Sequence, residues 1–348
     1  MAIGAVPASA MEAGTAACVS QSADTSWKAA LAQLPVVPEF HGVIRTRYEL
    51  DTRHGDGRFQ VRNARLSAQL RVARILTMFI NTDFCDAGSM KILDAWAGAD
   101  VARGVNVRMG QFRMPFGEDS HLGPANYIFA NRSFIGKQMA NYRAVGVQGQ
   151  WTPQFGGTSG PLMLAAGVFN PYTITSHKRW TKSYAASAKA RLTLGHWRLE
   201  TGFMSVAPDA VRANMADVAV RWANSAVTLD AEYLYKHYTN SAHRPTHGYL
   251  VAADWRKPLD HTVFNRFSAQ ARLDGMTAHS SLTRNDGQLV TDHPLRNRLT
   301  LGATISHLGP KSLQAHLRLN YEKYFWGHLT EADPHAGDKL VAEFVISF

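Results

Sequence analysis

Arginine and lysine side chains are spaced through this 348-residue chain, and at some places two of them stand two positions apart. In Arg45-Thr-Arg47 and in Lys189-Ala-Arg191, a single residue separates the two cations. Alternate residues of a β-strand face the same side, so this spacing gathers the cations on one face. A guanidinium donates two parallel hydrogen bonds to phosphate or carboxylate groups, and rings of such cations in a confined pore select anions. The pattern therefore predicts binding and passage of anions.

Carboxylates are expected on the same face of the strands, so many of these cations should form ion pairs across neighbouring strands. The excess of cations over carboxylates carries the functional prediction. The cations expected on the inner face are Arg45, Arg47, Arg65, Lys189, Arg191, Arg198, Arg221, Lys236, Arg256, Arg272, Arg298, Arg318 and Lys339. The carboxylates expected there are Glu49, Glu200, Asp217, Asp230, Glu232, Asp254, Asp274, Glu322 and Glu343.

The overall charge is strongly basic, with 37 Lys and Arg against 27 Asp and Glu and a formal net charge of +10. Such a balance suits nucleic acid, a membrane surface or an anion pathway. The basic residues stand singly and are spaced through strands, which disfavours nucleic acid as a partner. No run approaches the roughly 18 to 20 apolar residues of a membrane-spanning helix.

Catalytic patterns are absent from the sequence. It contains neither Gly-x-Ser-x-Gly nor His-Glu-x-x-His, and of its 15 histidines only His316 is clearly at an inward strand position. A hydrolase would need Ser, His and Asn or Asp side chains converging at one depth. We therefore expect no enzyme, no metal and no cofactor.

Apolar and polar residues alternate in short segments from about residue 40 onward, which predicts two-faced strands. About sixteen such segments follow one another, and an even number of antiparallel strands is typical of bacterial transmembrane barrels. The fold class expected is all-β, a closed antiparallel transmembrane β-barrel. The segments are 42–51, 59–70, 75–84, 92–100, 105–116, 143–151, 162–169, 183–194, 197–206, 215–223, 226–237, 248–256, 267–276, 297–307, 313–325 and 339–348.

Short and long connections mostly alternate along the chain, as expected when periplasmic turns alternate with external loops. The last segment alternates and stops on Phe348, which resembles the C-terminal strand recognised by the barrel-assembly machinery. We expect a leader remnant and periplasmic arm at 1–39 and one barrel at 40–348, in contact with outer-membrane lipid.

The connection at about 114–142 is the longest, and a loop of this length is usually functional. It carries two cations, Arg132 and Lys137, and also Glu118 and Asp119. We interpret it as the third external loop, folded into the bore as a constriction.

Several motifs around this loop resemble the phosphate-selective porin family, the O and P porins. They are Arg113-Met-Pro-Phe-Gly117, Asn131-Arg132-Ser133 and Arg143-Ala-Val-Gly-Val-Gln148, with Phe59-Gln-Val-Arg-Asn-Ala-Arg-Leu66 and Leu93-Asp-Ala95 upstream. The resemblance implies an outer-membrane location, a homotrimer, and a loop that narrows the bore while basic side chains pass phosphate along. Transferred residue by residue, it implies Arg113, Arg132, Lys137 and Arg143 at the constriction and Arg45, Arg47 and Arg65 on the adjoining wall.

Alternatives remain open from the sequence. Arg132 and Arg143 either line the pore or anchor the loop to wall carboxylates. Glu118 and Asp119 reduce the cationic character of the loop, so a general anion preference without phosphate specificity is one alternative. A sugar or peptide pore is another, although its bore would be expected to carry more aromatics, and an outer-membrane enzyme is a third. We expect a passive, anion-preferring channel.

Overall fold

The computed structural model describes residues 38–72, 75–86, 88–155, 158–176, 179–208, 211–261, 263–285, 288–310, 313–326 and 337–348. The expected leader remnant and periplasmic arm fall almost entirely on residues 1–37, outside the described residues. Among the described residues, no helix is long and apolar enough to span a membrane.

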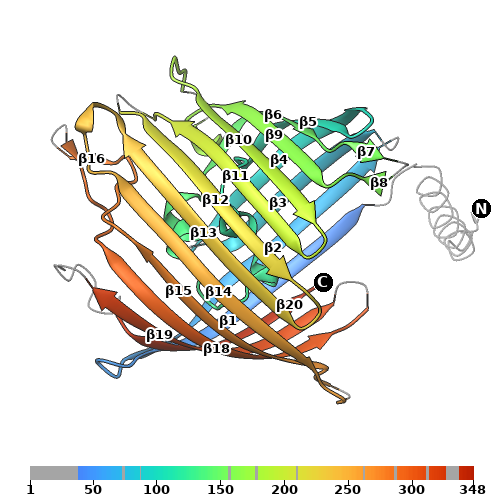
Figure 1. The fold of residues 1–348 in the computed structure, drawn as a ribbon, viewed down its shortest axis with the longest axis vertical. Coiled ribbons are helices and arrows are strands. Elements are labelled where there is room, and N and C mark those ends of the chain that lie inside the picture. The colour runs from blue at the N-terminus through green and yellow to red at the C-terminus, as the bar shows by residue number, and fades with distance from the viewer. Residues whose placement is uncertain are drawn as a thin grey trace, which may run out of the picture.

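Sixteen strands form one closed barrel in which each strand is antiparallel to its neighbours (Figure 1). The first and last strands close it, pairing from Val43 with Ser347 to Asp51 with Lys339. This confirms the fold class predicted from the alternation. The barrel strands are β1 (Glu39–Asp51), β2 (Gly57–Val72), β3 (Leu76–Asp86), β4 (Ser89–Ala102), β5 (Val105–Arg113), β6 (Arg143–Trp151), β9 (Leu162–Phe169), β10 (Ala185–Leu194), β11 (Trp197–Val206), β12 (Ala213–Ala223), β13 (Val227–Tyr238), β14 (Thr246–Pro258), β15 (Arg266–Met276), β18 (Arg296–Leu308), β19 (Gln314–Trp326) and β20 (Lys339–Ser347).

Connections differ at the two ends of the barrel. At one end, β4 and β5 are joined by a two-residue turn, as are β10 and β11, and Gly104 (φ 75°) and Gly195 (φ 56°) supply the positive φ that such tight turns need. The longest connections, 114–142 and 277–295, leave the other end. We refer to these as the turn end and the loop end. Two small hairpins lie in connections: β7 (Gln154–Phe155) with β8 (Thr158–Ser159), and β16 (Arg284–Asn285) with β17 (Gln288–Leu289).

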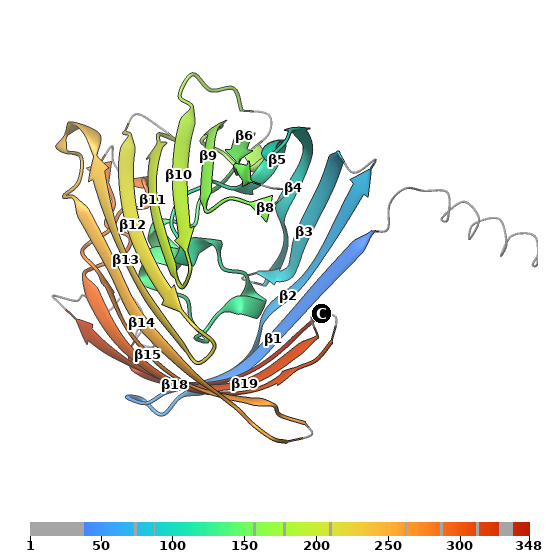
Figure 2. The ribbon, with the colours of Figure 1, turned by 45° about the vertical axis from the view of Figure 1, so that its right-hand side comes forward.

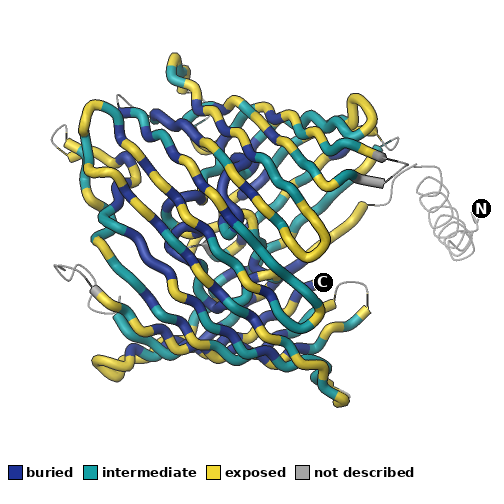
Figure 3. The backbone as a smooth tube through the Cα atoms, in the orientation of Figure 1, coloured by how far each residue is buried: buried dark blue, intermediate teal, exposed yellow. Residues whose placement is uncertain are grey.

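Side chains alternate between the two faces of the barrel wall, as the burial pattern along the strands shows (Figure 3). In β20, Phe344 and Ile346 are exposed on the outer face, whereas Val341, Glu343 and Val345 are buried on the inner face. Exposed apolar residues recur outward on every side of the barrel, among them Met78, Val218, Leu229, Val251, Leu273, Leu301 and Leu317. A continuous outward apolar surface is what a lipid-facing barrel presents.

Aromatic residues also recur on the outer face. The exposed members are Tyr184, Trp197, Tyr233, Tyr235, Trp255 and Tyr321. Because the outer wall has no protein core to join, these rings can contact lipid and its headgroups.

The connection between β5 and β6 runs inside the barrel, as the segment drawn within the ring of strands shows (Figure 2). We call residues 114–142 the inner loop. It contains short helical turns that the sequence pattern did not predict: η1 (Asp119–His121), η2 (Pro124–Asn126) and the π-turn η3 (Ile135–Met139). Connections elsewhere hold two further short turns, η4 (Ile174–Ser176) and η5 (Thr239–Ser241).

A buried apolar core joins the inner loop to one side of the wall. Its loop members include Met114, Phe116, Phe129, Phe134, Ile135 and Met139, and its wall members include Met204, Val206, Met215, Leu234 and Leu250. Most wall members belong to β11–β14, so the loop fills this arc of the barrel. The remaining wall members are Phe112 of β5, Ala144 of β6, Phe169 of β9, Ala185 of β10 and Met276 of β15. The sequence analysis did not predict this core, which forms because apolar side chains of the loop need partners that exclude water.

Candidate functional site

Backbone amides of the inner loop are bound by side chains of the wall. The amides of Glu118 and Asp119 donate to the Glu232 carboxylate at 3.0 and 2.9 Å, and that of Phe134 donates to Asp274 at 3.0 Å. Irregular backbone away from bulk water needs such acceptors. Glu232 and Asp274, two carboxylates expected as ion-pair partners of wall cations, therefore bind the loop backbone.

Carbonyls of the inner loop accept hydrogen bonds from wall arginines. Arg45 donates to the carbonyl of Ala130 at 2.5 Å, and Arg272 donates to that of Asn131 at 2.8 Å. Arg298 donates to the carbonyl of Arg132 at 2.8 Å. The loop is thus fastened to strands β1, β15 and β18 near its middle.

Arg45 and Arg47, expected on the pore wall, are on the inner face but buried and paired. Arg45 forms an ion pair with Glu343, and Arg47 pairs with Glu49 at 2.6 Å and donates to Asn131 at 2.8 Å. Their exposed fractions are 2% and 8%. These contacts make both residues anchors of the loop.

Glu118 of the inner loop lies in a cluster of four wall cations. Its carboxylate is 3.8 Å from Lys189, 3.6 Å from Arg191 and 3.4 Å from Arg221, and it forms an ion pair with Arg198. This loop carboxylate, expected to reduce the cationic character of the loop, thus neutralises part of the β10–β12 wall.

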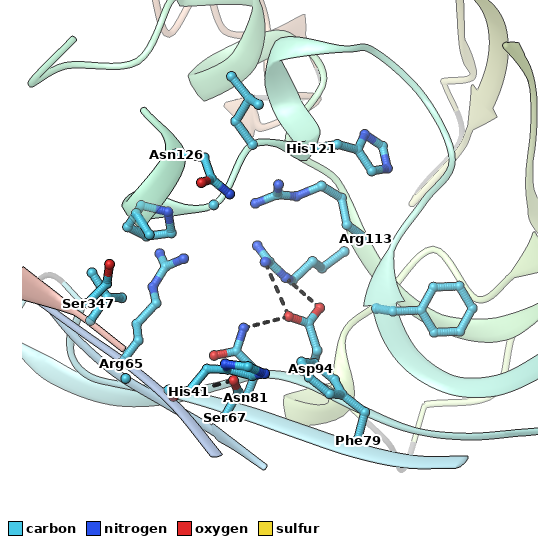
Figure 4. A pocket seen from close by; sticks show the side chains of 18 of the residues that line it. His41, Arg65, Ser67, Phe79, Asn81, Asp94, Arg113, His121, Asn126 and Ser347 are labelled. Carbon is cyan, nitrogen blue, oxygen red and sulfur yellow. Dashed lines mark hydrogen bonds and ion pairs between the residues drawn. The ribbon is translucent and has the colours of Figure 1, made fainter. Parts of the chain in front are cut away.

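The opposite arc of the wall, β1–β6, is not filled by the loop. A cavity of about 630 Å³ lies there, between the wall and the loop segment 121–126. Four arginines from three strands line it, and its loop side carries His121 and Asn126. Figure 4 shows Arg65 and Arg113 directed into this cavity, with Asp94 below them. We call it the arginine cavity; its arginines are Arg65, Arg108, Arg113 and Arg143.

Carboxylates compensate two of these four arginines. Arg65 pairs with Asp83 at 2.7 Å, and Arg143 pairs with Asp94 at 3.0 Å. Arg113 donates to the carbonyl of Ser120, and Arg108 donates to Gln148 at 3.0 Å. Within the described part of the chain, neither Arg108 nor Arg113 has a carboxylate at ion-pair distance. The cavity therefore carries an excess of positive charge.

The predicted site residues are divided between different surroundings. Arg65, Arg113 and Arg143 line one cavity, although they are far apart in sequence. Arg143 lines this cavity and also pairs with the wall carboxylate of Asp94. A role of Arg143 in lining the ion path stays a prediction. Arg132 instead donates to the Ser120 carbonyl within the loop at 3.0 Å, with its guanidinium 5.7 Å from the Tyr127 ring centroid.

Lys137 extends from η3 into solvent within the bore, and its side chain is exposed. Partial desolvation there, together with the nearby guanidinium groups of Arg62, Arg298 and Arg296, lowers the pKa of Lys137 to about 8. Among the described residues, its ammonium group has no hydrogen-bond or ion-pair partner. A free cation inside a bore is well placed to attract anions.

A second cavity of about 500 Å³ lies toward the turn end, below the loop segment 122–128. Its lining includes Arg221, Arg256, Arg266, Arg318 and His316. Asp254 is the carboxylate in this lining. Leu122, Ala125, Asn126 and Gln314 line both cavities, so the two are adjacent.

Arg108 and Arg266 are cavity arginines that the sequence analysis left out of its inner-face set. The alternation around Arg108 could have identified it, because its neighbour Met109 is exposed on the outer face. Arg266 stands at the start of β15, one residue before the segment predicted as a strand.

No protein-family model matches the chain, and a search of curated proteins finds no match either. Solved structures do match. An anion-selective porin from Comamonas acidovorans is 13% identical with a TM-score of 0.61, covering 90% of this chain and all of that one. OprB of Pseudomonas putida is 10% identical with a TM-score of 0.62, covering 94% and 97%.

OmpF of Salmonella typhi is 14% identical with a TM-score of 0.61, covering 89% of this chain and 97% of that one. The chain therefore has the fold of outer-membrane porins, a sixteen-stranded barrel. At these identities the likeness establishes the fold, and the chemistry of the bore must be argued from this chain's own residues.

Proposed function

We propose that this protein is an outer-membrane porin, a passive diffusion channel that prefers small anions, phosphate among them. The observation that carries the proposal is the charge of the arginine cavity, where Asp83 and Asp94 compensate only two of four arginines. Fixed positive charge in a confined aqueous path lowers the barrier for anions and raises it for cations.

The position of the cavity supports a role in transport. The inner loop fills the β11–β14 arc and leaves open space against β1–β6. An ion moving between the two ends would pass between the loop and these arginines. The loop is the proposed constriction, with Arg65, Arg113 and Arg143 on its open side and Lys137 nearer the loop end.

Phosphate suits this lining because guanidinium groups can donate several hydrogen bonds to its oxygens. The porin from Comamonas acidovorans, a structural neighbour, is named as anion-selective. Homotrimer formation and recognition of the Phe348 strand by the barrel-assembly machinery stay predictions.

Reversal potential in a planar bilayer tests the proposal. The purified protein under a KCl gradient should show a potential of the sign expected for chloride preference. Lys137→Glu should shift it toward potassium, because this side chain is exposed and makes no side-chain bond among the described residues. Replacing Arg132 as well should increase the shift.

Lys257→Glu is the matched control. Lys257 is exposed and stands two positions after the outward Trp255 on β14, so both side chains face the outside of the barrel. The same charge change is therefore made outside the bore. An unshifted potential in Lys137→Glu would show that the inner loop does not border the ion path. A potassium-preferring wild type would refute the anion channel itself.

A further inference from the structure

An aromatic pair faces the arginine cavity. Phe79 of β3 and Trp96 of β4 are direct cross-strand partners, with ring centroids 5.5 Å apart and planes inclined by 30°. Both side chains are half-buried, and both line the cavity. Inward residues of a water-filled barrel are usually polar, so partly exposed rings here leave apolar surface in contact with the aqueous path.

Charged and polar groups lie directly beside these rings. Asn81 and Asp94 are the next inward pair on the same two strands, and Asn81 donates to Asp94 at 2.9 Å. Asp94 in turn accepts from Arg143 at 3.0 Å. The guanidinium of Arg143 is therefore held at the inward residue pair next to the aromatic pair.

A further guanidinium contacts the rings. The guanidinium carbon of Arg108 is 5.5 Å from the ring centroid of Trp96 and 4.2 Å from that of Phe112. The positions of these rings are thus stabilised by cation–π contact. Arg113 lines the same cavity and has no carboxylate partner within the described residues.

This arrangement offers an apolar aromatic surface and uncompensated guanidinium groups within one cavity. Inorganic phosphate would use the guanidinium groups alone, and a neutral sugar would use the rings but leave the charge unmatched. An anion with a flat ring matches both. The cavity volume of about 630 Å³ is within the range of small-molecule sites.

We propose that the arginine cavity binds monocyclic aromatic carboxylates in transit, with the ring against Phe79 and Trp96 and the carboxylate bonded by Arg113 and Arg143. The inference rests on the proposed anion channel and specifies its substrate class. Offset or edge contacts between aromatic rings contribute about 0.5–1.5 kcal/mol beyond burial, which corresponds to about a two- to twelvefold gain in affinity.

Block of single-channel chloride current tests this with benzoate as the probe. Cyclohexanecarboxylate is the matched comparison, because it has the same charge and a similar size but no aromatic ring. Benzoate should half-block the wild-type current at a concentration about two- to twelvefold lower than cyclohexanecarboxylate. Trp96→Leu and Phe79→Leu should each remove most of this difference.

Trp255→Leu is the control, since Trp255 is exposed on the outer face; it should retain the benzoate preference. Equal block by benzoate and cyclohexanecarboxylate in the wild type would overturn the inference, and this comparison needs no variant to fold. So would an unchanged preference in both leucine variants. A wild type that prefers chloride but does not distinguish the two carboxylates refutes the ring site alone, whereas a wild type without chloride preference refutes the channel proposal.

Discussion

Glu118→Gln should make the channel more selective for anions. Glu118 is the loop carboxylate that lies 3.4–3.8 Å from Lys189, Arg191 and Arg221 and pairs with Arg198. Glutamine is nearly isosteric and removes one negative charge. The loop should remain in place, because the amides of residues 118 and 119 still donate to Glu232.

The expected magnitude follows from these distances. An anion bonded to one of the four cations around Glu118 lies about 3 Å beyond that cation. The anion is then about 7 Å from the Glu118 carboxylate. At the permittivity of water, one unit charge at about 7 Å changes the energy of an ion by about 0.6 kcal/mol. The effect has opposite signs for chloride and potassium, so their permeability ratio changes by about 1.2 kcal/mol. Screening at 0.1 M salt about halves this value, leaving about a threefold increase in the ratio.

Reversal potentials at 0.1 M and 1 M salt, each at two pH values, are the assay. Burial and the neighbouring Glu200 carboxylate raise the pKa of Glu118 above its usual range, so its negative charge is present at high pH and is lost as the pH falls through the raised pKa. The variant should therefore differ from the wild type at pH 8.5 and converge with it at pH 5.5. The difference should also decrease at 1 M salt, where the screening length is about 3 Å.

Asp260→Asn is the control, because Asp260 is an exposed carboxylate in the turn between β14 and β15. A permeability ratio that is the same in wild type and Glu118→Gln at pH 8.5 and 0.1 M would refute the reasoning. So would a change that persists undiminished at pH 5.5, since it would then come from altered loop structure.

Three further predictions concern the loop and the wall. The pKa of Lys137 is about 8, so its positive charge is lost as pH rises through 8. The preference for anions, measured as a reversal potential, should therefore decrease between pH 7 and pH 9. Lys137→Gln should make this decrease smaller. Asp274→Asn should destabilise the barrel by about 3–5 kcal/mol, because Asp274 lies 3.2 Å from Arg272 and 2.9 Å from Arg298 and accepts a hydrogen bond from the amide of Phe134 in the loop. Thermal unfolding measures the loss of stability, and increased open-channel noise would show that the loop is released. An unchanged melting temperature would contradict the anchoring role. Gly110→Ala should cost about 1–3 kcal/mol, because Gly110 has φ 138° and an added Cβ would lie 2.3 Å from the Ala95 carbonyl oxygen; Gly149→Ala, with nothing within 4 Å of its Cβ position, is the matched control in the same melting experiment.

The strands could be predicted because their pattern depends on a local rule. Each outward side chain meets lipid and most inward side chains meet water, so the period of two survives over the whole wall. The strand predicted at 105–116 is the instructive difference. It ends at Arg113, because Met114 and Phe116 leave the wall as part of the inner loop and are buried in the apolar core.

The loop contacts could not be predicted, because they join residues far apart in sequence. The amide of Ala130 donates to Asn320 at 2.7 Å, a contact between residues 190 positions apart. The inward pair of Phe79 and Trp96 was missed for a related reason. The register between β3 and β4 shifts near Thr82, and a bulge of this kind changes which residues face inward without any mark in a single sequence.

The fastening of the inner loop has a mechanical consequence. β1 and β11 stand eight places apart in the order of sixteen strands, on opposite sides of the ring. The loop is tied to β1 through Arg45 and to β11 through the ion pair of Glu118 with Arg198. It therefore acts as a cross-brace that resists flattening of the ring under lateral pressure from the bilayer. Releasing the loop on either side, which on the Glu118 side also requires loss of the amide bonds to Glu232, should let the cross-section become oval.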